Sequence, residues 1–180
     1  MQQTKPNKAY TLVFIFKNNC QQVLLGQKKR GFGEGKWNGF GGKVEKDESI
    51  KDAAIREMWE ESGIKIQNQD LKFQGFMTFD MDTDMTKLFR IHIFTATKYE
   101  GNEIETDEMK PQWFDINKIP YEQMWLDDKI WYPYMFDKKF FNCFCHFKDQ
   151  NEILDCKIEE LKNLEHLLQI QKQNCEFKLE

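Results

Sequence analysis

Three glutamates in the first half of the chain have a spacing that could place them on one face of a helix. Glu57, Glu60 and Glu61 stand at positions i, i+3 and i+4, which are neighbours on an α-helical surface. Carboxylates gathered in this way repel one another, so a solvated acidic face is one interpretation. The other is a site for Mg²⁺, with Mn²⁺ as an alternative, because such hard cations prefer oxygen ligands and Mg²⁺ keeps waters that substrate phosphates replace.

The residues around these glutamates favour the metal site. Residues 42–64, GKVEKDESIKDAAIREMWEESGI, match the Nudix box, G-x5-E-x7-R-E-U-x-E-E-x-G-U with U apolar, at every position. A chance match at a given start has a probability on the order of 10⁻⁹. The chain therefore resembles a Nudix hydrolase, an enzyme that hydrolyses a nucleoside diphosphate linked to another group. The resemblance implies that Arg56 pairs with Glu48 and orients the metal-binding face. The general base is Glu60 or Glu61, and the sequence leaves that choice open.

The elements that must hold the box can be predicted from hydrophobic patterns and turn residues. The box is expected to be a helix that begins near residues 47–49 and ends at Gly63, which suits a left-handed helix end. Further helices are predicted at residues 121–136 and 158–170, and a turn at residues 81–86. Strands are predicted at residues 10–16, 22–27, 71–80, 87–98, 104–109, 112–115, 140–147 and 153–158. This order predicts an α+β fold, with a mixed β-sheet sandwiched between helices.

A glycine-rich loop, residues 28–43, precedes the box. Its sequence, KKRGFGEGKWNGFGGK, lets the backbone approach a ligand closely, although such loops often only turn the chain. The loop also concentrates cations in a chain that is otherwise acidic: Lys28, Lys29, Arg30, Lys36 and Lys43. Because an acidic helix follows, the loop is expected to form a cradle for phosphates and metal.

The C-terminal part is expected to be separate from the rest. Residues 1–160 are predicted to form a Nudix domain and residues 161–180 a helical extension. The helix predicted at residues 158–170 has an apolar face, made of Ile158, Leu161, Leu164, Leu167, Leu168 and Ile170. Such a stripe is rarely left exposed on a monomer. The helix is therefore expected to dock on its own domain or on a partner protein, with self-docking favoured.

Composition excludes several classes of protein. The 180 residues suffice for one domain, and 40% hydrophobic residues are typical of a folded globule. A net charge of −4 argues against a partner such as duplex nucleic acid. No apolar run has membrane-spanning length, and the polar residues 1–10 show no signal-peptide pattern. The five cysteines lack a CxxC pair and are expected to be reduced thiols, which are neither disulfides nor a zinc site. A cytoplasmic protein is expected, with access to the nucleus undecided.

Three further segments, residues 28–44, 107–114 and 124–133, narrow the resemblance. They are similar to the oxidised purine nucleoside triphosphatases of the MutT-homologue type, and the similarity runs from about residue 10 to about residue 161. Members of this subgroup hydrolyse damaged purine nucleoside triphosphates such as 8-oxo-dGTP to the monophosphate and pyrophosphate with Mg²⁺. The resemblance thus implies sanitation of the nucleotide pool, which avoids DNA damage.

The resemblance also implies roles for individual residues. The implied metal ligands are Gly41 (through its carbonyl), Glu57, Glu60, Glu61 and Glu108, and Glu48 and Arg56 complete the catalytic set. The implied substrate-binding residues are Thr11, Lys28, Phe32, Asn38, Phe40, Gly41, Gly42, Lys43, Phe79, Trp125, Leu126, Asp127 and Asp128. Departures from the subgroup at Phe89, Met81 and Leu126 leave the range of accepted bases open.

The proposed base pocket is chemically coherent. Trp125 offers a π-surface for stacking, and Asn38 offers both a donor and an acceptor. Asp127 and Asp128 are adjacent, and both cannot stay charged cheaply if they are buried. One of them, protonated, would donate to a purine edge. The alternative is that the two aspartates only cap the following helix.

Two other functions compete with nucleotide-pool sanitation. The chain could be a Nudix pyrophosphohydrolase that acts on another nucleoside diphosphate derivative, such as a dinucleoside polyphosphate, a nucleotide sugar or capped RNA. It could also be a Nudix-fold binding subunit without catalysis, docked through its C-terminal helix. The intact box weighs against the second, and the set of Asn38, Trp125, Asp127 and Asp128 weighs against the first.

Overall fold

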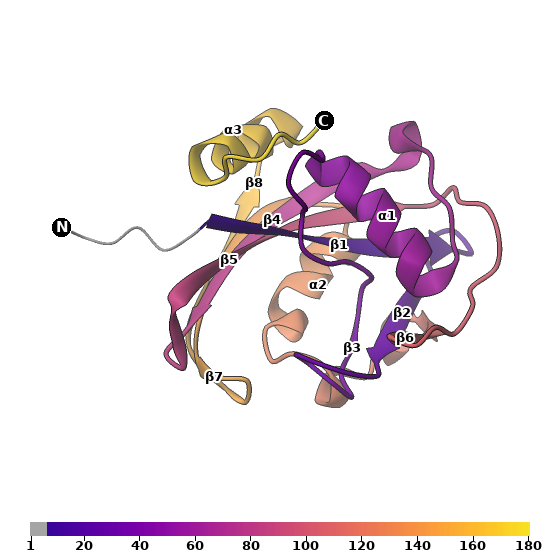
Figure 1. Ribbon diagram of the computed structural model, residues 1–180, viewed down its shortest axis with the longest axis horizontal. Coiled ribbons are helices and arrows are strands. Elements are labelled where there is room, and N and C mark those ends of the chain that lie inside the picture. Colours follow the sequence, from indigo (N-terminus) through magenta and orange to yellow (C-terminus); the bar gives the residue numbers. More distant parts are fainter. Residues whose placement is uncertain (1–6) are drawn as a thin grey trace.

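A mixed β-sheet runs through the molecule, and helices cover both of its faces (Figure 1). The computed structural model describes residues 7–180, and the side chains of all of these except residue 7 and residues 84–87. The strands are β1 (Asn7–Lys17), β2 (Gln22–Lys28), β3 (Trp37–Asn38), β4 (Lys72–Met81), β5 (Asp84–Ala96), β6 (Met109–Asp115), β7 (Phe140–Asp149) and β8 (Glu152–Leu161). The α-helices are α1 (Ile50–Ser62), α2 (Asp128–Phe136) and α3 (Leu164–Asn174).

The sheet order is β3-β2-β1-β5-β4-β7-β8, with β6 paired to β2. The pairs β1–β5 and β4–β7 are parallel, and the other pairs are antiparallel. The predicted α+β fold with a mixed sheet between helices is therefore confirmed. The strands predicted at residues 10–16 and 22–27 form the antiparallel pair of β1 and β2. The turn expected at residues 81–86 is tighter than predicted, because Met81 already pairs with Asp84.

The two faces of the sheet carry separate cores because side chains alternate along each strand. On β1, Val13 and Ile15 face a core that contains residues of α1 and α3. Their neighbours Phe14 and Phe16 face the other core, which contains Trp131 of α2. One helix layer therefore consists of α1 and α3, and the opposite layer of α2 (Figure 1).

The prediction of a strand at residues 104–109 is wrong, because residues 104–108 form no strand and β6 begins at Met109. The Ile104 amide donates instead to the Ser62 carbonyl at the end of α1, at 2.8 Å. The Thr106 amide donates to the Met109 carbonyl at 2.9 Å, which closes a local turn. Strand β6 then runs through Pro111. An edge strand tolerates this proline, since β6 pairs only with β2.

The helix predicted at residues 121–136 is wrong over its first half. Residues 121–123 form a 3₁₀ turn, and α2 begins at Asp128. The chain turns just before α2, where the Asp128 amide donates to the Trp125 carbonyl at 3.1 Å. The Asp128 carboxylate accepts in return from the Trp125 amide at 3.0 Å. This local bonding competes with a continuous helix.

The helix predicted at residues 158–170 is wrong at its start, because β8 continues to Leu161 in pairing with β7. Helix α3 begins only at Leu164, where the side chain of the N-cap residue Asn163 accepts from the His166 amide at 3.0 Å. Leu167 is fully buried in the core shared with α1, and Leu168 packs against it. The helix thus docks on its own domain. The division of the chain at residue 160 stays a prediction.

Two cysteines depart from the expected reduced state. Cys145 and Cys156 lie directly opposite each other on β7 and β8 and form a disulfide. The sulfur of Cys143, two residues along β7, lies 3.6 Å from that of Cys145 and 3.8 Å from that of Cys156. The prediction of reduced thiols is wrong for the bonded pair, because the pairing depends on strand register and not on a CxxC motif.

Two expectations concern membranes and the N-terminus. None of the helices in residues 7–180 is both long and apolar enough to cross a membrane. Residues 1–6 of the polar N-terminal segment lie outside the described residues, so the expectation about them stays a prediction.

Candidate active site

Helix α1 is set in place by signals at both ends. The hydroxyl of the N-cap residue Ser49 accepts from the Asp52 amide at 3.1 Å, as expected for this residue type. Gly63 ends the helix with a left-handed φ of 75°, which costs a glycine little. Glu48 therefore lies just before the helix, and Glu57, Glu60 and Glu61 lie within its second half.

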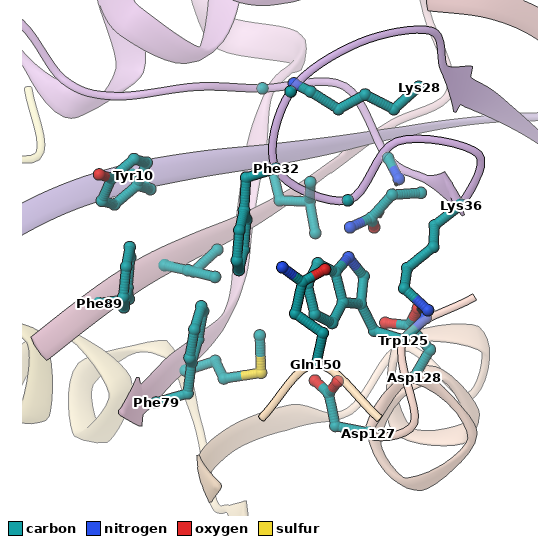
Figure 2. A pocket seen from close by; sticks show the side chains of 18 of the residues that line it. Tyr10, Lys28, Phe32, Lys36, Phe79, Phe89, Trp125, Asp127, Asp128 and Gln150 are labelled. Atoms are coloured by element: carbon teal, nitrogen blue, oxygen red, sulfur yellow. Dashed lines mark hydrogen bonds between the residues drawn. The ribbon is translucent and has the colours of Figure 1, made fainter. Parts of the chain in front are cut away.

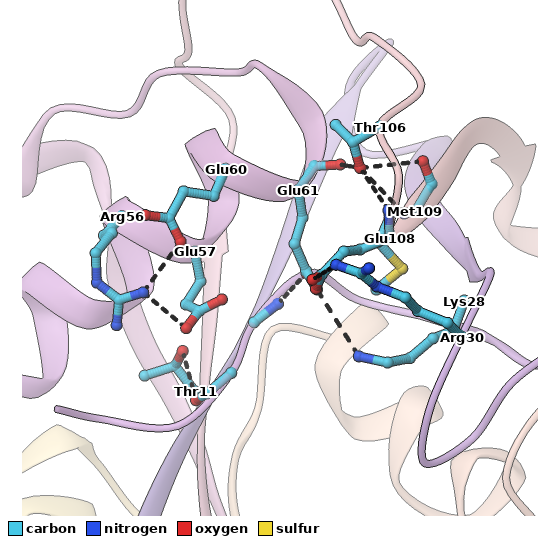
Figure 3. Close-up of polar contacts among 12 residues, drawn as sticks. Thr11, Lys28, Arg30, Arg56, Glu57, Glu60, Glu61, Thr106, Glu108 and Met109 are labelled. Carbon is cyan, nitrogen blue, oxygen red and sulfur yellow. Dashed lines mark hydrogen bonds and ion pairs between the residues drawn. The ribbon is translucent and has the colours of Figure 1, made fainter.

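Arg56 joins the box glutamates into one network (Figure 3). Its guanidinium donates two hydrogen bonds to the Glu48 carboxylate, from Nη2 to Oε1 at 2.7 Å and from Nε to Oε2 at 3.1 Å. A third nitrogen, Nη1, reaches Glu57 at 2.8 Å and Glu60 at 3.2 Å. Hydrogen bonding from Arg56 lowers the pKa of Glu48 below its ordinary value. The pair of Arg56 with Glu48 is the one that the Nudix resemblance implies. The role of Arg56 in orienting a metal-binding face stays a prediction.

Glu61 is the most buried of the box glutamates, with 4% of its surface exposed. Burial raises its pKa to about 7, although the Gly41 amide donates to its carboxylate at 2.8 Å and opposes the rise. The ammonium of Lys28 lies 4.0 Å from the same carboxylate. Burial also raises the pKa of Glu57, and Arg56 opposes that rise. Burial thus disfavours the charged form of both carboxyls, and the neighbouring Arg56 and Lys28 offset this only in part.

The glycines of the loop let the backbone reach this face of α1. A Cβ atom at Gly42 would lie 2.5 Å from the Glu57 carboxylate, and one at Gly41 would lie 2.0 Å from the Thr11 carbonyl oxygen. The loop is fixed to β1, since the Thr11 amide donates to the Gly42 carbonyl at 2.9 Å. A larger residue at either position would push the loop away from the carboxylates.

Outside the box, Glu108 is a further carboxylate that was predicted to bind the metal. Glu108 lies just before β6 and forms an ion pair with Arg30 of the loop (Figure 3). The Glu108 carbonyl accepts from the Lys29 amide at 2.8 Å, which ties the two segments together. Glu57, Glu61 and Glu108 interact electrostatically, because Glu57 and Glu108 both raise the pKa of Glu61. Gly41 and Glu108 thus lie near Glu61, and Glu57 and Glu60 both contact Arg56. Among the described residues, however, no three of these carboxylates have oxygens within 4.8 Å of one another. Their donor set is still one that a hard divalent cation prefers.

A cavity of about 1300 Å³ begins beside Gly41 and Glu108 and extends along the sheet. Glu57, Glu60 and Glu61 are not among the residues that line it. At one end it is lined by Lys28, Gly42 and Glu108, and at the other by Asp127 and Asp128. The walls between are aromatic (Figure 2). Ring contacts form a continuous series between centroids: Trp125 with Phe32 at 4.9 Å, Phe32 with Phe89 at 6.3 Å, and Phe89 with Phe79 at 4.5 Å and with Tyr10 at 5.5 Å.

The two aspartates at the far end are almost fully buried, with 4% of Asp127 and 2% of Asp128 exposed. Asp127 accepts from the indole nitrogen of Trp131 at 3.1 Å, and Asp128 accepts from the Trp125 amide. Burial raises the pKa of Asp127 to about 6. Burial, followed by the charge of Asp127, raises the pKa of Asp128 well above its ordinary value. Asp127 makes no side-chain hydrogen bond to cap α2, so helix capping does not explain both carboxyls.

Asn38 borders the same end of the cavity. Its side-chain oxygen accepts from the Gly39 amide at 2.8 Å and from the Tyr132 hydroxyl at 3.5 Å. These bonds fix the orientation of the amide group, which could then offer its nitrogen to a ligand.

Most of the predicted substrate-binding residues line this cavity: Thr11, Lys28, Phe32, Asn38, Gly41, Gly42, Phe79, Trp125, Asp127 and Asp128. Phe40, Lys43 and Leu126 do not. Phe40 is fully buried in the core beside α1, and the Lys43 side chain is exposed away from the cavity lining. Leu126 is half-buried, since the turn before α2 directs its neighbours into the cavity instead.

The structure adds lining residues that the sequence did not single out as substrate contacts. The Lys36 ammonium lies over the Trp125 ring, 5.2 Å from its centroid, and near the acidic pair. Phe147 and Gln150 reach the cavity from the β7–β8 hairpin. Lys36 stood out only as one of several loop cations. The hairpin residues carried no signal, because their position depends on the parallel pairing of β4 with β7.

A helix that presents carboxylates beside a glycine-rich loop, at the mouth of a cavity with an aromatic wall, defines a metal-assisted hydrolase of phosphate compounds. A family model described as the NUDIX domain matches residues 6–135. The chain belongs to the Nudix family of hydrolases, which act with a divalent cation.

Two relatives and one solved structure are similar over most of the chain. The oxidized purine nucleoside triphosphate hydrolase of Danio rerio is 48% identical over 158 residues, which cover 88% of this chain and 98% of the relative. The protein of the same name from Mus musculus is 43% identical over 155 residues, which cover 86% and 96%. The crystal structure of the MutT protein from Bacillus halodurans superposes with a TM-score of 0.74 at 25% identity, covering 84% of this chain and 97% of the other.

Proposed function

We propose that this protein hydrolyses oxidised purine nucleoside triphosphates of the 8-oxo-dGTP type to the monophosphate and pyrophosphate, and so sanitises the cytoplasmic nucleotide pool. One observation carries the proposal. A single cavity joins the loop that faces the box carboxylates of α1 to the buried pair Asp127 and Asp128. The triphosphate and the base of one nucleotide would occupy its two ends. The similarity to hydrolases named for oxidised purine nucleoside triphosphates supports the same substrate.

The base end of the cavity provides the hydrogen-bonding groups that an oxidised guanine needs. Oxidation of guanine at C8 places a proton on N7 and converts that position from an acceptor into a donor. A charged Asp127 or Asp128 accepts from such a donor, and its protonated neighbour donates to the base carbonyl. The raised pKa of both groups supports a shared proton. Trp125, half-exposed beside them, offers its ring for stacking.

The phosphate end would hold Mg²⁺, with Mn²⁺ as a substitute, through Glu57, Glu60, Glu61, Glu108 and the Gly41 carbonyl. Carboxylate and carbonyl oxygens are the donors that such hard cations prefer, and this supports the assignment. When bound, the cation neutralises phosphate charge and makes a bound water more acidic. Lys28 and Arg30 line the same cavity beside Glu61 and Glu108 and would bind the phosphate oxygens. The general base would be Glu60 or Glu61, one of the box carboxylates.

The direct experiment is a screen of nucleotides with product identification. Purified protein with Mg²⁺ is offered 8-oxo-dGTP, dGTP, a dinucleoside tetraphosphate, a nucleotide sugar and capped RNA, and the products are resolved by ³¹P NMR. We expect pyrophosphate and the monophosphate, formed fastest from 8-oxo-dGTP. Faster hydrolysis of the nucleotide sugar, the dinucleoside compound or the capped RNA would assign the protein to another Nudix substrate class.

A non-catalytic binding subunit is the remaining alternative. It would show no turnover of any compound in the screen. The docking of α3 on its own core weighs against this role, because the buried Leu167 is not available to a partner.

A further inference from the structure

The end of the chain completes the first turn of α1. The first four amides of an α-helix lack carbonyl partners within the helix. In α1, the amides of Asp52 and Ala53 are satisfied by Ser49, at 3.1 Å and 3.0 Å. The two remaining amides donate to the C-terminal tail, which we define as residues 175–180. Ile50 donates to the Lys178 carbonyl at 2.9 Å, and Lys51 donates to the Leu179 carbonyl at 3.0 Å.

The tail is held in the shape that these bonds require. Gln171 of α3, with 2% of its surface exposed, donates from its side chain to the Phe177 carbonyl at 3.0 Å. The apolar side chains of Phe177 and Leu179 pack against the core shared with α1. Figure 1 shows the C-terminus beside the start of α1, with α3 next to it.

An ion pair adds to this contact. The Lys51 ammonium lies 2.7 Å from the Glu180 carboxylate, and only 13% of the lysine side chain is exposed. The tail therefore contacts α1 through backbone, apolar and charged groups together.

The position of α1 matters because its carboxylates fit tightly against the loop. The Gly41 amide bonds Glu61, and the space at Gly42 is filled by the Glu57 carboxylate, 2.5 Å from where a Cβ would stand. Metal and catalytic sites lose function when their groups move by a fraction of an ångström to about 1 Å. A helix fixed at only one end could make such a movement.

We propose that the C-terminal tail is a positioning segment, which fixes α1 so that its box carboxylates form the divalent-cation site. The inference rests on the proposed function for the identity of that site. It assigns the tail a role in metal binding that is distinct from a general contribution to stability. Phe177, Lys178 and Leu179 act through α1 and do not touch the substrate cavity.

The test compares the full chain with a chain that ends at Phe177, which lacks both carbonyl acceptors. Lys178→Ala is the matched control, because it removes an exposed side chain and keeps the backbone. Two readouts without substrate are measured: Mn²⁺ affinity by electron paramagnetic resonance, and hydrogen exchange of residues 50–62. Melting temperature is recorded for each chain.

We expect the shortened chain to bind Mn²⁺ roughly tenfold more weakly, as is typical when support of metal ligands is lost, with faster exchange at Ile50 and Lys51. The Lys178→Ala variant should stay within about twofold of the parent. If the shortened chain does not fold, Gln171→Ala replaces it in the comparison. This variant removes the hydrogen bond to the Phe177 carbonyl and keeps the tail. Unchanged Mn²⁺ affinity in a folded variant with a lower melting temperature would overturn the proposal. An inactive full chain that binds Mn²⁺ would instead contradict the proposed function.

Discussion

The two ends of the cavity differ in how the carboxyl groups near them are held. At the phosphate end, Arg56 contacts Glu48, Glu57 and Glu60, so cationic and anionic side chains are in direct contact. At the base end, Asp127 and Asp128 make hydrogen bonds to an indole and a backbone amide, and no ion pair of either is found among the described residues. In the proposed function, a divalent cation completes the first end. A proton shared between the two aspartates completes the second.

Because the two ends differ in this way, removal of a carboxylate should have a different effect at each end. Removal of a carboxylate at the phosphate end should impair catalysis on every substrate. Removal of a carboxylate at the base end should change the choice of base and leave the requirement for metal intact.

The largest effect is expected for Glu57→Gln. The amide keeps the size of the side chain but loses the charge that a divalent cation needs. We expect kcat to fall by about 10²–10⁴-fold on both 8-oxo-dGTP and dGTP, without loss of folding, since like-charge repulsion is also relieved. Steady-state kinetics with saturating Mg²⁺ measure the effect, and Glu165→Gln on the exposed face of α3 is the control. Activity at the parental level would break the assignment of the phosphate end.

A smaller effect is expected at the aromatic wall. Trp125→Leu removes the ring that would stack on the base, and stacking of a base on an aromatic side chain contributes about 1–3 kcal/mol. We expect KM to rise by roughly 5- to 150-fold, with the Mg²⁺ concentration for half-maximal activity unchanged. Trp125→Phe keeps an aromatic ring and should lose less. A shift in the Mg²⁺ requirement would show that the two ends do not act separately.

The smallest effect is a dependence of stability on pH. Asp127 has an ordinary pKa of 3.8, and burial raises it to about 6 in the folded protein. The folded state therefore holds this proton more tightly than the unfolded chain does. Its stabilising contribution is complete below about pH 4 and is lost as pH rises through about 6.

Denaturant unfolding of the parent and of Asp127→Asn from pH 4 to pH 7 tests this dependence. The variant should gain stability relative to the parent as pH rises, by at most about 1.4 kcal/mol per pH unit. Asp155→Asn, at an exposed position on β8, should follow the parent. A constant difference across the range would contradict a raised pKa at Asp127.

The phosphate end could be predicted from the sequence to a large extent because its parts are local. Glutamates at helical spacing, Ser49 before them and Gly63 after them specify α1 through short-range rules, and the structure has each of these features. The ion pair of Arg56 with Glu48 spans eight positions of one segment. Such patterns do not depend on how distant strands pair.

The features that could not be predicted depend on tertiary contacts or on local side-chain bonding. Gln150 reaches the cavity only because β7 lies parallel to β4, and Cys145 meets Cys156 only in the register of β7 with β8. The helix expected over residues 121–136 begins only at Asp128, whose carboxylate accepts from the Trp125 amide in the preceding turn. The helix predicted at residues 158–170 began too early, because apolar residues at helical spacing extend back to residue 158. In the structure these first residues belong to β8, which pairs with β7. Long-range pairing of this kind leaves little mark in a single sequence.

In the proposed function, the base end of the cavity selects the oxidised base, and the phosphate end is where the triphosphate is hydrolysed. The most direct measurement is kcat/KM for 8-oxo-dGTP and for dGTP in the parent, in Asp127→Asn and in Asp128→Asn, all at saturating Mg²⁺. An asparagine fixes the donor pattern that a shared proton would otherwise adapt, and each mismatched buried hydrogen bond costs about 1–3 kcal/mol. We predict that each variant changes the ratio of the two kcat/KM values by roughly 5- to 150-fold, with an unchanged Mg²⁺ requirement. Equal losses on the oxidised and the normal nucleotide would show that these aspartates do not read the base.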